Sequence, residues 1–151
     1  MKLPITVRYA IRICCIIAGA SRMLSIASIA DRAGMSPRTV ENIHAQLKKA
    51  GITQGTVGSR GGLRLALPPS EISVSGIMEA VGGEVDLFLC QGEKGNKCPN
   101  DEDCAMRAVW RDITERVQAV FEGISLGELL QIYNANVDEN LDPAECLPAV
   151  R

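Results

Sequence analysis

Residues 36–51 read SPRTVENIHAQLKKAG, and this stretch carries the clearest helix signal in the chain. Ser36 followed by Pro37 is the preferred order at a helix start, an N-cap oxygen and then proline at the first helical position. Gly51 is typical of a helix end. The stretch therefore predicts an amphipathic helix, whose apolar residues recur at helical spacing: Val40, Ile43, Leu47 and Ala50.

A shorter helix is expected just before this one, following Leu24, with Ser25 or Ser28 as its cap. A Gly34-Met35 turn would join the two, and two helices joined by a short glycine-containing turn form a helix-turn-helix. The second helix would face DNA with side chains that can address base edges and phosphates. These candidates are Ser36, Arg38, Thr39, Glu41, Asn42 and Lys49.

After the second helix the pattern changes from helical spacing to alternation, which predicts a β-hairpin. Residues 52–57 can form one strand, the glycine-rich turn 58–62 follows, and leucines alternate with other residues over 63–67. A hairpin directly behind a helix-turn-helix is a wing, which reaches a phosphate or a narrow minor groove. Its candidate DNA-binding residues are Ser59, Arg60 and Arg64.

The charge of the chain is divided between its two halves. Residues 1–67 hold ten Lys and Arg against two acids, a net charge of +8, whereas residues 68–151 hold six against sixteen, a net charge of −10. A basic half suggests a polyanionic partner. The expected partner of the first half is therefore double-stranded DNA.

Further helices are expected over residues 5–19, 73–81 and 106–124. The last has a strong apolar stripe and is too long for so small a domain to cover, so a second copy of the chain is its expected cover. Such a homodimer would present two recognition helices to a pseudo-palindromic operator. The expected regions are a winged helix-turn-helix domain (1–67), a linker helix and cysteine-bearing loop (68–104), a dimerisation helix region (105–134) and a flexible acidic tail (135–151).

The fold class expected is mainly α with a small β-hairpin wing, a winged helix-turn-helix domain plus a long dimerisation helix. Length, at 151 residues, suits about one domain, and 3% aromatic residues exclude extended base-stacking platforms. No apolar run could span a bilayer and no secretion signal is evident, so we expect a cytoplasmic protein without membrane contact. We expect no enzyme, because the chain has one histidine and neither a Ser/His/Asp set nor a phosphate loop.

Three cysteines, Cys90, Cys98 and Cys104, lie close together in a polar, glycine-containing segment. Their spacing, C-x7-C-x5-C, is neither the paired C-x2-C of structural zinc sites nor a ferredoxin run. Three thiolates from one loop can hold a metal or one face of an iron–sulfur cluster, while redox-active thiols or inert cysteines remain alternatives. Cys14 and Cys15 are interpreted as packing residues of a helix, and Cys146 as a tail residue without a role.

The chain resembles the dimeric winged-helix bacterial regulators that include IscR, NsrR and CymR. The resemblance covers nearly everything from residue 1 to about residue 130. It rests on the motifs RYAIR (8–12), IADRAGMS (29–36), LKKAG (47–51), GGLRLA (61–66), IMEAVG (77–82) and the three cysteines followed by AVWRD (108–112). It implies an iron–sulfur cluster on Cys90, Cys98 and Cys104 whose state controls operator affinity. It also places Glu41 at the acid that family members use to discriminate operators.

This sequence departs from the family pattern at several places. Arg107 stands where the IscR type has a ligating histidine, and Arg8 stands where the NsrR type has an aspartate. The fourth ligand could be Cys146, an exogenous molecule or a carboxylate. His44 replaces a large apolar residue and is interpreted as a half-buried packing residue with a satisfied nitrogen. In the wing, Arg60 lies three places nearer the tip than the family's arginine. The candidate carboxylates are Glu93, Asp101, Glu102 and Asp103.

The sequence thus predicts a DNA-binding transcriptional regulator, acting as a repressor, with an iron–sulfur cluster that senses redox state, nitric oxide or iron–sulfur status. The absent histidine favours the four-iron over the two-iron cluster. Two other functions remain open: an iron–sulfur or zinc protein of another class, such as an electron carrier or cluster-transfer protein, and a clusterless thiol-based regulator.

Overall fold

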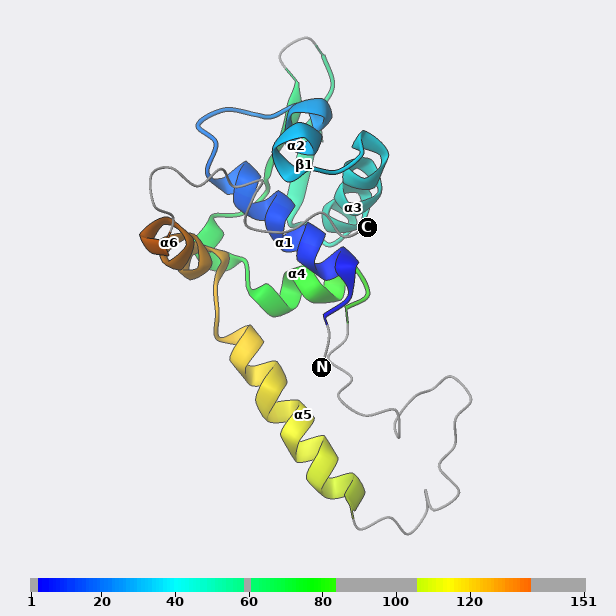
Figure 1. Ribbon diagram of the computed structural model, residues 1–151, viewed down its shortest axis with the longest axis vertical. Helices are drawn as coiled ribbons and strands as arrows, with labels where there is room; N and C mark the ends of the chain where they lie inside the picture. The colour runs from blue at the N-terminus through cyan, green and yellow to red at the C-terminus, as the bar shows by residue number, and fades with distance from the viewer. Residues whose placement is uncertain (1–2, 59–60, 84–105, 137–151) are drawn as a thin grey trace.

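The computed structural model describes residues 3–58, 61–83 and 106–136. They form a winged helix-turn-helix body from which one long helix extends as an arm (Figure 1). The predicted fold class, mainly α with a β-hairpin wing, is confirmed. In chain order the elements are α1 (Ile5–Ala18), α2 (Ile26–Ala33), α3 (Pro37–Lys49), β1 (Thr53–Thr56), β2 (Gly62–Leu65), η1 (Pro69–Glu71), α4 (Val74–Ala80), α5 (Met106–Glu122) and α6 (Leu126–Asn136).

Local capping explains why α2 and α3 begin and end where they do. The Ser25 side chain accepts a hydrogen bond from the Ser28 amide at 3.2 Å, so Ser25 is the N-cap of α2. Gly34 ends α2 in the left-handed conformation, at φ 64°, which glycine adopts without a steric penalty. Ser36 then caps α3, with Pro37 in its first turn as predicted.

The wing is an antiparallel pair in which Thr53 lies opposite Leu65 and Thr56 opposite Gly62. Its second strand is also tied to the segment before α2, because Leu63 and Leu24 exchange two backbone hydrogen bonds of 2.8 and 3.2 Å. Gly62 permits this close approach: a Cβ there would lie 2.7 Å from the Leu24 carbonyl oxygen. The wing is therefore attached to the helix-turn-helix through β2.

The region 105–134, expected to hold one long dimerisation helix, contains two helices. α5 ends at Glu122, and α6 returns to the body beside α1 (Figure 1). Ser125 and Glu128 form a capping box at this break: the Ser125 amide donates to Glu128 Oε2 at 2.8 Å and the Glu128 amide to Ser125 Oγ at 3.1 Å. Backbone bonds from Val74 to Ile124 and from Leu126 to Ile72 then fasten this elbow to the start of α4.

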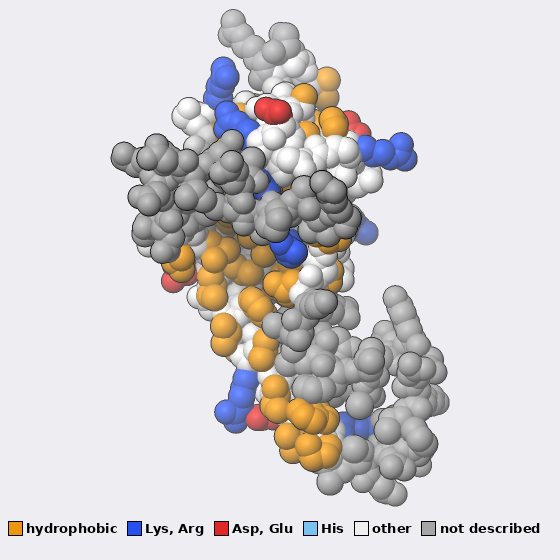
Figure 2. Space-filling model, in the orientation of Figure 1, with side chains coloured by type: hydrophobic (Ala, Val, Ile, Leu, Met, Phe, Trp, Pro, Cys, Tyr) orange, Lys and Arg blue, Asp and Glu red, His pale blue; other side chains and the backbone are white. Residues whose placement is uncertain are grey.

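Along α5 the apolar stripe is exposed or only partly buried in the single chain. None of its 17 residues, all of them described, is buried. Met106, Val109 and Val120 expose 46, 45 and 60% of their surface. Figure 2 shows hydrophobic side chains gathered along the arm, below the body. Unlike α1 to α4, α5 contributes no buried residue to the core, although Phe121 near its end packs against it.

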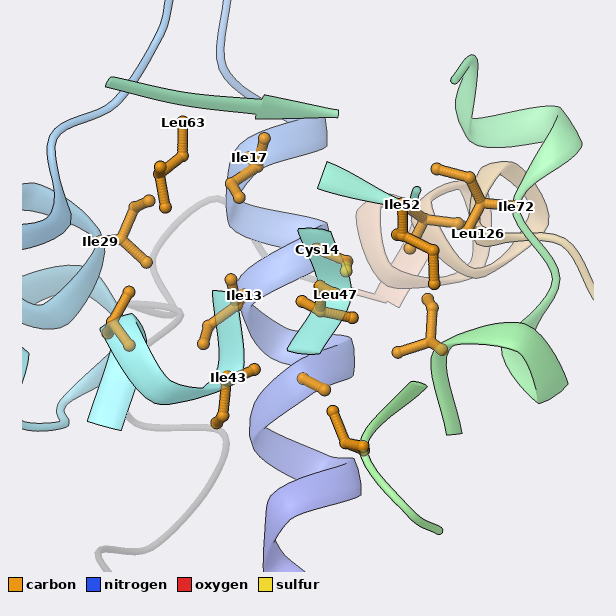
Figure 3. Packing of buried hydrophobic residues seen from close by; sticks show 14 of the residues in the cluster. Ile13, Cys14, Ile17, Ile29, Ile43, Leu47, Ile52, Leu63, Ile72 and Leu126 are labelled. Atoms are coloured by element: carbon orange, nitrogen blue, oxygen red, sulfur yellow. The ribbon is translucent and has the colours of Figure 1, made fainter. Parts of the chain in front are cut away.

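The core lies around α1, whose side chains meet every other part of the body. Cys14 and Ile13 are fully buried, and Ile17 nearly so, between α2 and the wing on one side and α4 and α6 on the other (Figure 3). Leu126 of α6 is fully buried in the same cluster. α6 is therefore part of the body, although the sequence analysis grouped it with the arm. Among the described residues, no helix has the length and apolarity that crossing a membrane requires.

Candidate nucleic-acid interface

The face of α3 that points away from the core carries the predicted DNA-binding residues. Arg38, Glu41 and Asn42 are exposed and Thr39 is half-buried. The opposite face, formed by Val40, Ile43 and Leu47, is buried in the core. The structure therefore brings the α3 candidates together on one polar surface. This arrangement follows from the helical period, because three apolar positions at that spacing leave the other positions free to face solvent.

Ser36 and Thr39 interact with each other at the start of this helix. Ser36 Oγ accepts from the Thr39 amide at 3.1 Å and lies 2.8 Å from Thr39 Oγ1. Both hydroxyls are thus oriented by the cap, which also fixes the first turn of α3. The backbone amides of that turn and the N-terminal end of the helix dipole favour a nearby phosphate.

Two further polar residues of the α3 surface, Gln46 and Lys48, are exposed and were missed by the sequence analysis. Gln46 Nε2 donates to the Asn42 carbonyl at 3.3 Å, so the two side chains belong to successive turns of one face. The spacing of four from Asn42 was the signal that could have found Gln46. Lys48 lies beside Lys49 in the last turn of the helix. Together they place two positive charges at the wing end of α3.

In the wing, Arg64 is exposed on β2 and lies directly opposite Gln54 of β1. Gln54 Nε2 donates to the Leu65 carbonyl at 3.4 Å, which keeps that side chain along the ribbon. Val57, just beyond β1, is fully exposed. Ser59 and Arg60, the predicted tip residues, lie outside the described residues.

A polar contact joins α3 to the wing. His44 Nδ1 lies 3.0 Å from Thr53 Oγ1. Thr53 is 2% exposed, and among the described residues it is the one polar residue that is buried. Partial burial and the nearby Lys48 charge hold the pKa of His44 below its usual value. The interpretation of His44 as a packing residue with a satisfied nitrogen is confirmed.

Behind the helix-turn-helix, α1 supplies two more arginines, Arg8 and Arg12, both half-buried. Arg12 Nη2 donates to the Arg32 carbonyl at 3.4 Å, near the end of α2. This bond brings the α1 guanidinium close to the turn of the helix-turn-helix. The positive charge of the first half of the chain is thus spread over α1, α2, α3 and β2.

The candidate metal ligands Cys90, Cys98 and Cys104 lie outside the described residues, as does Cys146. Among residues 3–58, 61–83 and 106–136, no group of three His, Cys, Asp or Glu side chains could hold a metal ion. Arg107 is exposed in the first turn of α5. The hypothesis that these cysteines hold a cluster therefore rests on the sequence.

The cysteines of α1 fit the interpretation as packing residues. Burial raises the pKa of Cys14 to about 12, with a further contribution from the neighbouring Cys15, and burial raises the pKa of Cys15 to about 11. Both thiols therefore stay protonated at neutral pH, and the thiolate is the form that binds metals and reacts with oxidants.

Comparison with known proteins assigns this architecture to a family. Two relatives named HTH-type transcriptional regulator IscR are each 35% identical to this chain. The alignment with the Aliivibrio salmonicida protein spans 122 residues, 79% of this chain and 71% of the relative. The alignment with the Klebsiella pneumoniae protein spans 105 residues, 70% of this chain and 63% of the relative. The chain thus spans about two thirds of the length of these relatives.

Solved structures show the same fold. IscR of T. potens superposes with a TM-score of 0.72 at 23% identity, covering 92% of this chain and 93% of that one. CymR, the global cysteine regulator of B. subtilis, superposes with a TM-score of 0.68 at 22% identity, covering 87 and 98%. The family model for Rrf2, described as an iron-dependent transcriptional regulator, matches residues 3–132. Together with the winged helix-turn-helix and its polar α3 surface, this match shows that the chain belongs to the Rrf2 family of transcriptional regulators.

Proposed function

We propose that the chain is a homodimeric, sequence-specific repressor whose affinity for a pseudo-palindromic operator is controlled by an iron–sulfur cluster. The observation that carries the DNA-binding part is the surface of α3. It presents charged and amide side chains to solvent while the opposite face is anchored in the core. A regulator of this kind acts where the chromosome is, in the cytoplasm.

Each α3 side chain suits a definite contact in the major groove. Arg38 can donate to guanine or a phosphate, Asn42 can pair with adenine, and Glu41 can accept from the N4 amino group of cytosine. Arg64 and Arg60 of the wing would bind the backbone or the adjacent minor groove. Phosphate contacts supply affinity that falls with salt, whereas the base contacts supply specificity.

The arm supports the homodimer. Its exposed apolar side chains, Val109 and Val120 among them, lose contact with water when a second arm packs against them. A two-fold axis between the arms would place two copies of α3 for two half-sites, one helical turn of DNA apart or a multiple of it.

The cluster part rests on the donor set. Thiolates are the ligands that iron–sulfur clusters take from proteins, and Cys90, Cys98 and Cys104 would supply three of them. α5 begins at Met106, two residues after Cys104 in the sequence, and helix N-terminal amides stabilise a nearby thiolate. When bound, the cluster would supply a redox-sensitive centre, and we propose the four-iron type.

The fourth ligand of the cluster is not Arg107, because a guanidinium has no free lone pair and stays protonated in proteins. It comes from one of the remaining donors, or from an exogenous small molecule or thiol. An exogenous or weak ligand would leave the cluster open to oxygen or nitric oxide. The remaining protein donors are Glu93, Asp101, Glu102, Asp103 and Cys146.

The deciding experiment measures iron and acid-labile sulfide per chain after purification without oxygen, together with operator affinity before and after cluster removal. About four of each per chain are expected for a four-iron cluster, and about two for a two-iron cluster. Cys98→Ala should lose both iron and sulfide, whereas the matched control Cys15→Ala should keep them.

Three results would contradict parts of this proposal. Bound zinc without sulfide would leave a DNA-binding protein with another metal role, and colourless thiol-dependent binding would indicate a clusterless regulator. Equal affinity for selected and random DNA, with and without the cluster, would contradict the regulator itself and favour an electron carrier or cluster-transfer protein.

A further inference from the structure

Among the apolar side chains that pack α3 against the wing lies one polar pair, Thr53 and His44. Thr53 is buried at 2% exposure, and the bond of 3.0 Å between its hydroxyl and His44 Nδ1 satisfies it. A buried hydroxyl that loses its partner destabilises the arrangement in which it is buried. This hydrogen bond therefore contributes to the position of β1 next to α3.

A second residue of the same strand face, Gly55, leaves room for the imidazole of His44. A Cβ on Gly55 would lie 3.3 Å from His44 Nε2 and 3.1 Å from Leu63 Cδ2. Thr53 and Gly55 are two positions apart in β1, so both face the same side of the ribbon. The ring is thus bonded to Thr53 at one nitrogen, and its other nitrogen lies next to the space that a side chain at residue 55 would fill.

The two strands of the wing are attached to the body in different ways. β2 is tied by backbone hydrogen bonds between Leu63 and Leu24. β1 is tied to α3 by the bond of 2.9 Å from the Ile52 amide to the Leu47 carbonyl, just before the strand, and within the strand by the side-chain contact of Thr53 with His44. Without the Thr53–His44 contact, the ribbon beyond Ile52 could rotate about the backbone ties at its base, and a small rotation there displaces the tip.

We infer that His44 is a positioning residue that sets the orientation of the wing relative to α3, and thereby the place where the wing meets the DNA flanking the α3 contact. The inference rests on the proposed function, because it assumes that the wing binds DNA. It identifies a determinant of operator recognition that itself need not touch the DNA. Partial burial, and then the charge of the exposed Lys48 on the same helix, hold the pKa of His44 below its usual value.

The test compares Thr53→Val, which keeps the shape of the side chain but removes the hydroxyl, with Thr53→Ser, which keeps the hydroxyl. The probe is a duplex selected by the wild-type protein from a random-sequence pool, and the readouts are affinity and hydroxyl-radical footprint. Thr53→Val should bind about fivefold more weakly, the loss expected for one part-buried hydrogen bond. It should lose or shift the outer protection from the wing while keeping the central protection from α3, and Thr53→Ser should behave as wild type.

Gly55→Ala is an independent test, because the added methyl group would press on the Nε2 side of the His44 ring. It should shift the same outer protection. Residual dipolar couplings measured without DNA should show β1 and β2 rotated relative to α3 in Thr53→Val and unrotated in Thr53→Ser. The matched control is Thr56→Ala, at an exposed position of the same strand, which should leave all readouts unchanged.

Unchanged affinity, footprint and couplings in Thr53→Val would overturn the inference, as would equal losses in the Val and Ser variants. Failure of the underlying function has a different signature: Arg60→Ala and Arg64→Ala would then leave the outer protection intact. In that event the wing does not bind DNA, and the inferred role in placing it on the operator is overturned as well, whatever the couplings show.

Discussion

The two longest helices of the described chain, α1 and α5, are both amphipathic but differ in what covers their apolar faces. α1 has 14 residues, of which Val7, Ala10, Ile13 and Cys14 are fully buried by the rest of the body. α5 has 17 residues and none is buried. The same sequence pattern thus produces the centre of a core in one case and an exposed surface in the other.

This difference indicates that the body and the arm depend on different interactions. The body gains its stability from contacts within one chain, so its folding should not depend on protein concentration. The arm exposes a stripe that a partner would cover, so its apolar contacts should depend on concentration. Four sets of variants test this division, and truncation of a core leucine has the largest expected effect.

Leu47→Ala tests whether the body is a single packed core. Leu47 is fully buried on α3, and truncating a buried leucine costs about 3 kcal/mol of unfolding free energy through lost transfer energy and a residual cavity. Urea denaturation at two protein concentrations measures the change. Gln46→Ala, at the exposed neighbouring position, is the control and should change stability by less than about 0.5 kcal/mol. A similar effect of both variants would contradict the packing described for α3.

Val109→Glu combined with Val120→Glu tests the arm. Two carboxylates placed in an apolar dimer interface must lose hydration, so the dimer dissociation constant should rise by about 100-fold, or about 2.7 kcal/mol. Analytical ultracentrifugation gives the constant, and circular dichroism should show the body still folded. Glu115→Gln, at an exposed charged position of α5, should leave the constant unchanged. A variant that stays fully dimeric would show that another surface joins the two copies.

Ser125→Ala tests the elbow that separates the arm from the body. Ser125 Oγ accepts from the Glu128 amide at 3.1 Å, and losing such an N-cap costs about 1 kcal/mol. The loss should appear as faster hydrogen exchange at the start of α6, because that helix, and not the arm, begins at this cap. Ser28→Ala is the control. Ser28 contributes only its backbone amide to the α2 cap, so removing its hydroxyl should leave that cap intact. If exchange rises equally in α5 and α6, the two helices unfold as one unit.

The smallest effect concerns the acid dependence of the same elbow. Hydrogen bonds from the backbone amide and then the hydroxyl of Ser125 hold the pKa of Glu128 below its ordinary value of 4.5. The ionised form is therefore favoured in the folded state. The stability that the ionised Glu128 carboxylate gives the folded state is present above pH 4.5, and it is lost as the pH falls through the lower pKa of the folded state. Glu128→Gln should remove this part of the acid dependence, measured as the difference in thermal midpoint from wild type between pH 6 and pH 3.

Sequence reasoning found the parts of the structure that local signals specify. The Ser36–Pro37 start of α3 and the hairpin after Gly51 are present as predicted. Of the predicted apolar stripe, Val40, Ile43 and Leu47 are buried, whereas Ala50 is the C-cap and is exposed. The same kind of signal predicted α4, whose N-cap is Ser73. The prediction placed residues 105–134 in one region with a helix over 106–124, and it did not find α6 as a separate helix. The Ser125–Glu128 capping box was a local signal that could have separated it from α5.

Within the candidate interface, exposure of the α3 side chains followed from their positions between buried residues. The contact between His44 and Thr53 could not be read in the same way. A half-buried histidine with a satisfied nitrogen was expected, but its partner comes from a strand of different spacing, and no periodic pattern shows which residues of two elements will meet. The bridge between Leu24 and Leu63 is of the same kind.

The sequence by itself determined the order of the helices and the wing, the residues that cap them, and the polar face of α3. These depend on backbone preferences and side-chain hydrogen bonds within a few residues of each other. Only the tertiary structure decided which apolar stripe is covered inside the chain, where α6 packs, and how β1 is attached to α3. Those outcomes depend on close packing between elements far apart in the chain, and such packing selects among partners that the sequence pattern leaves equivalent.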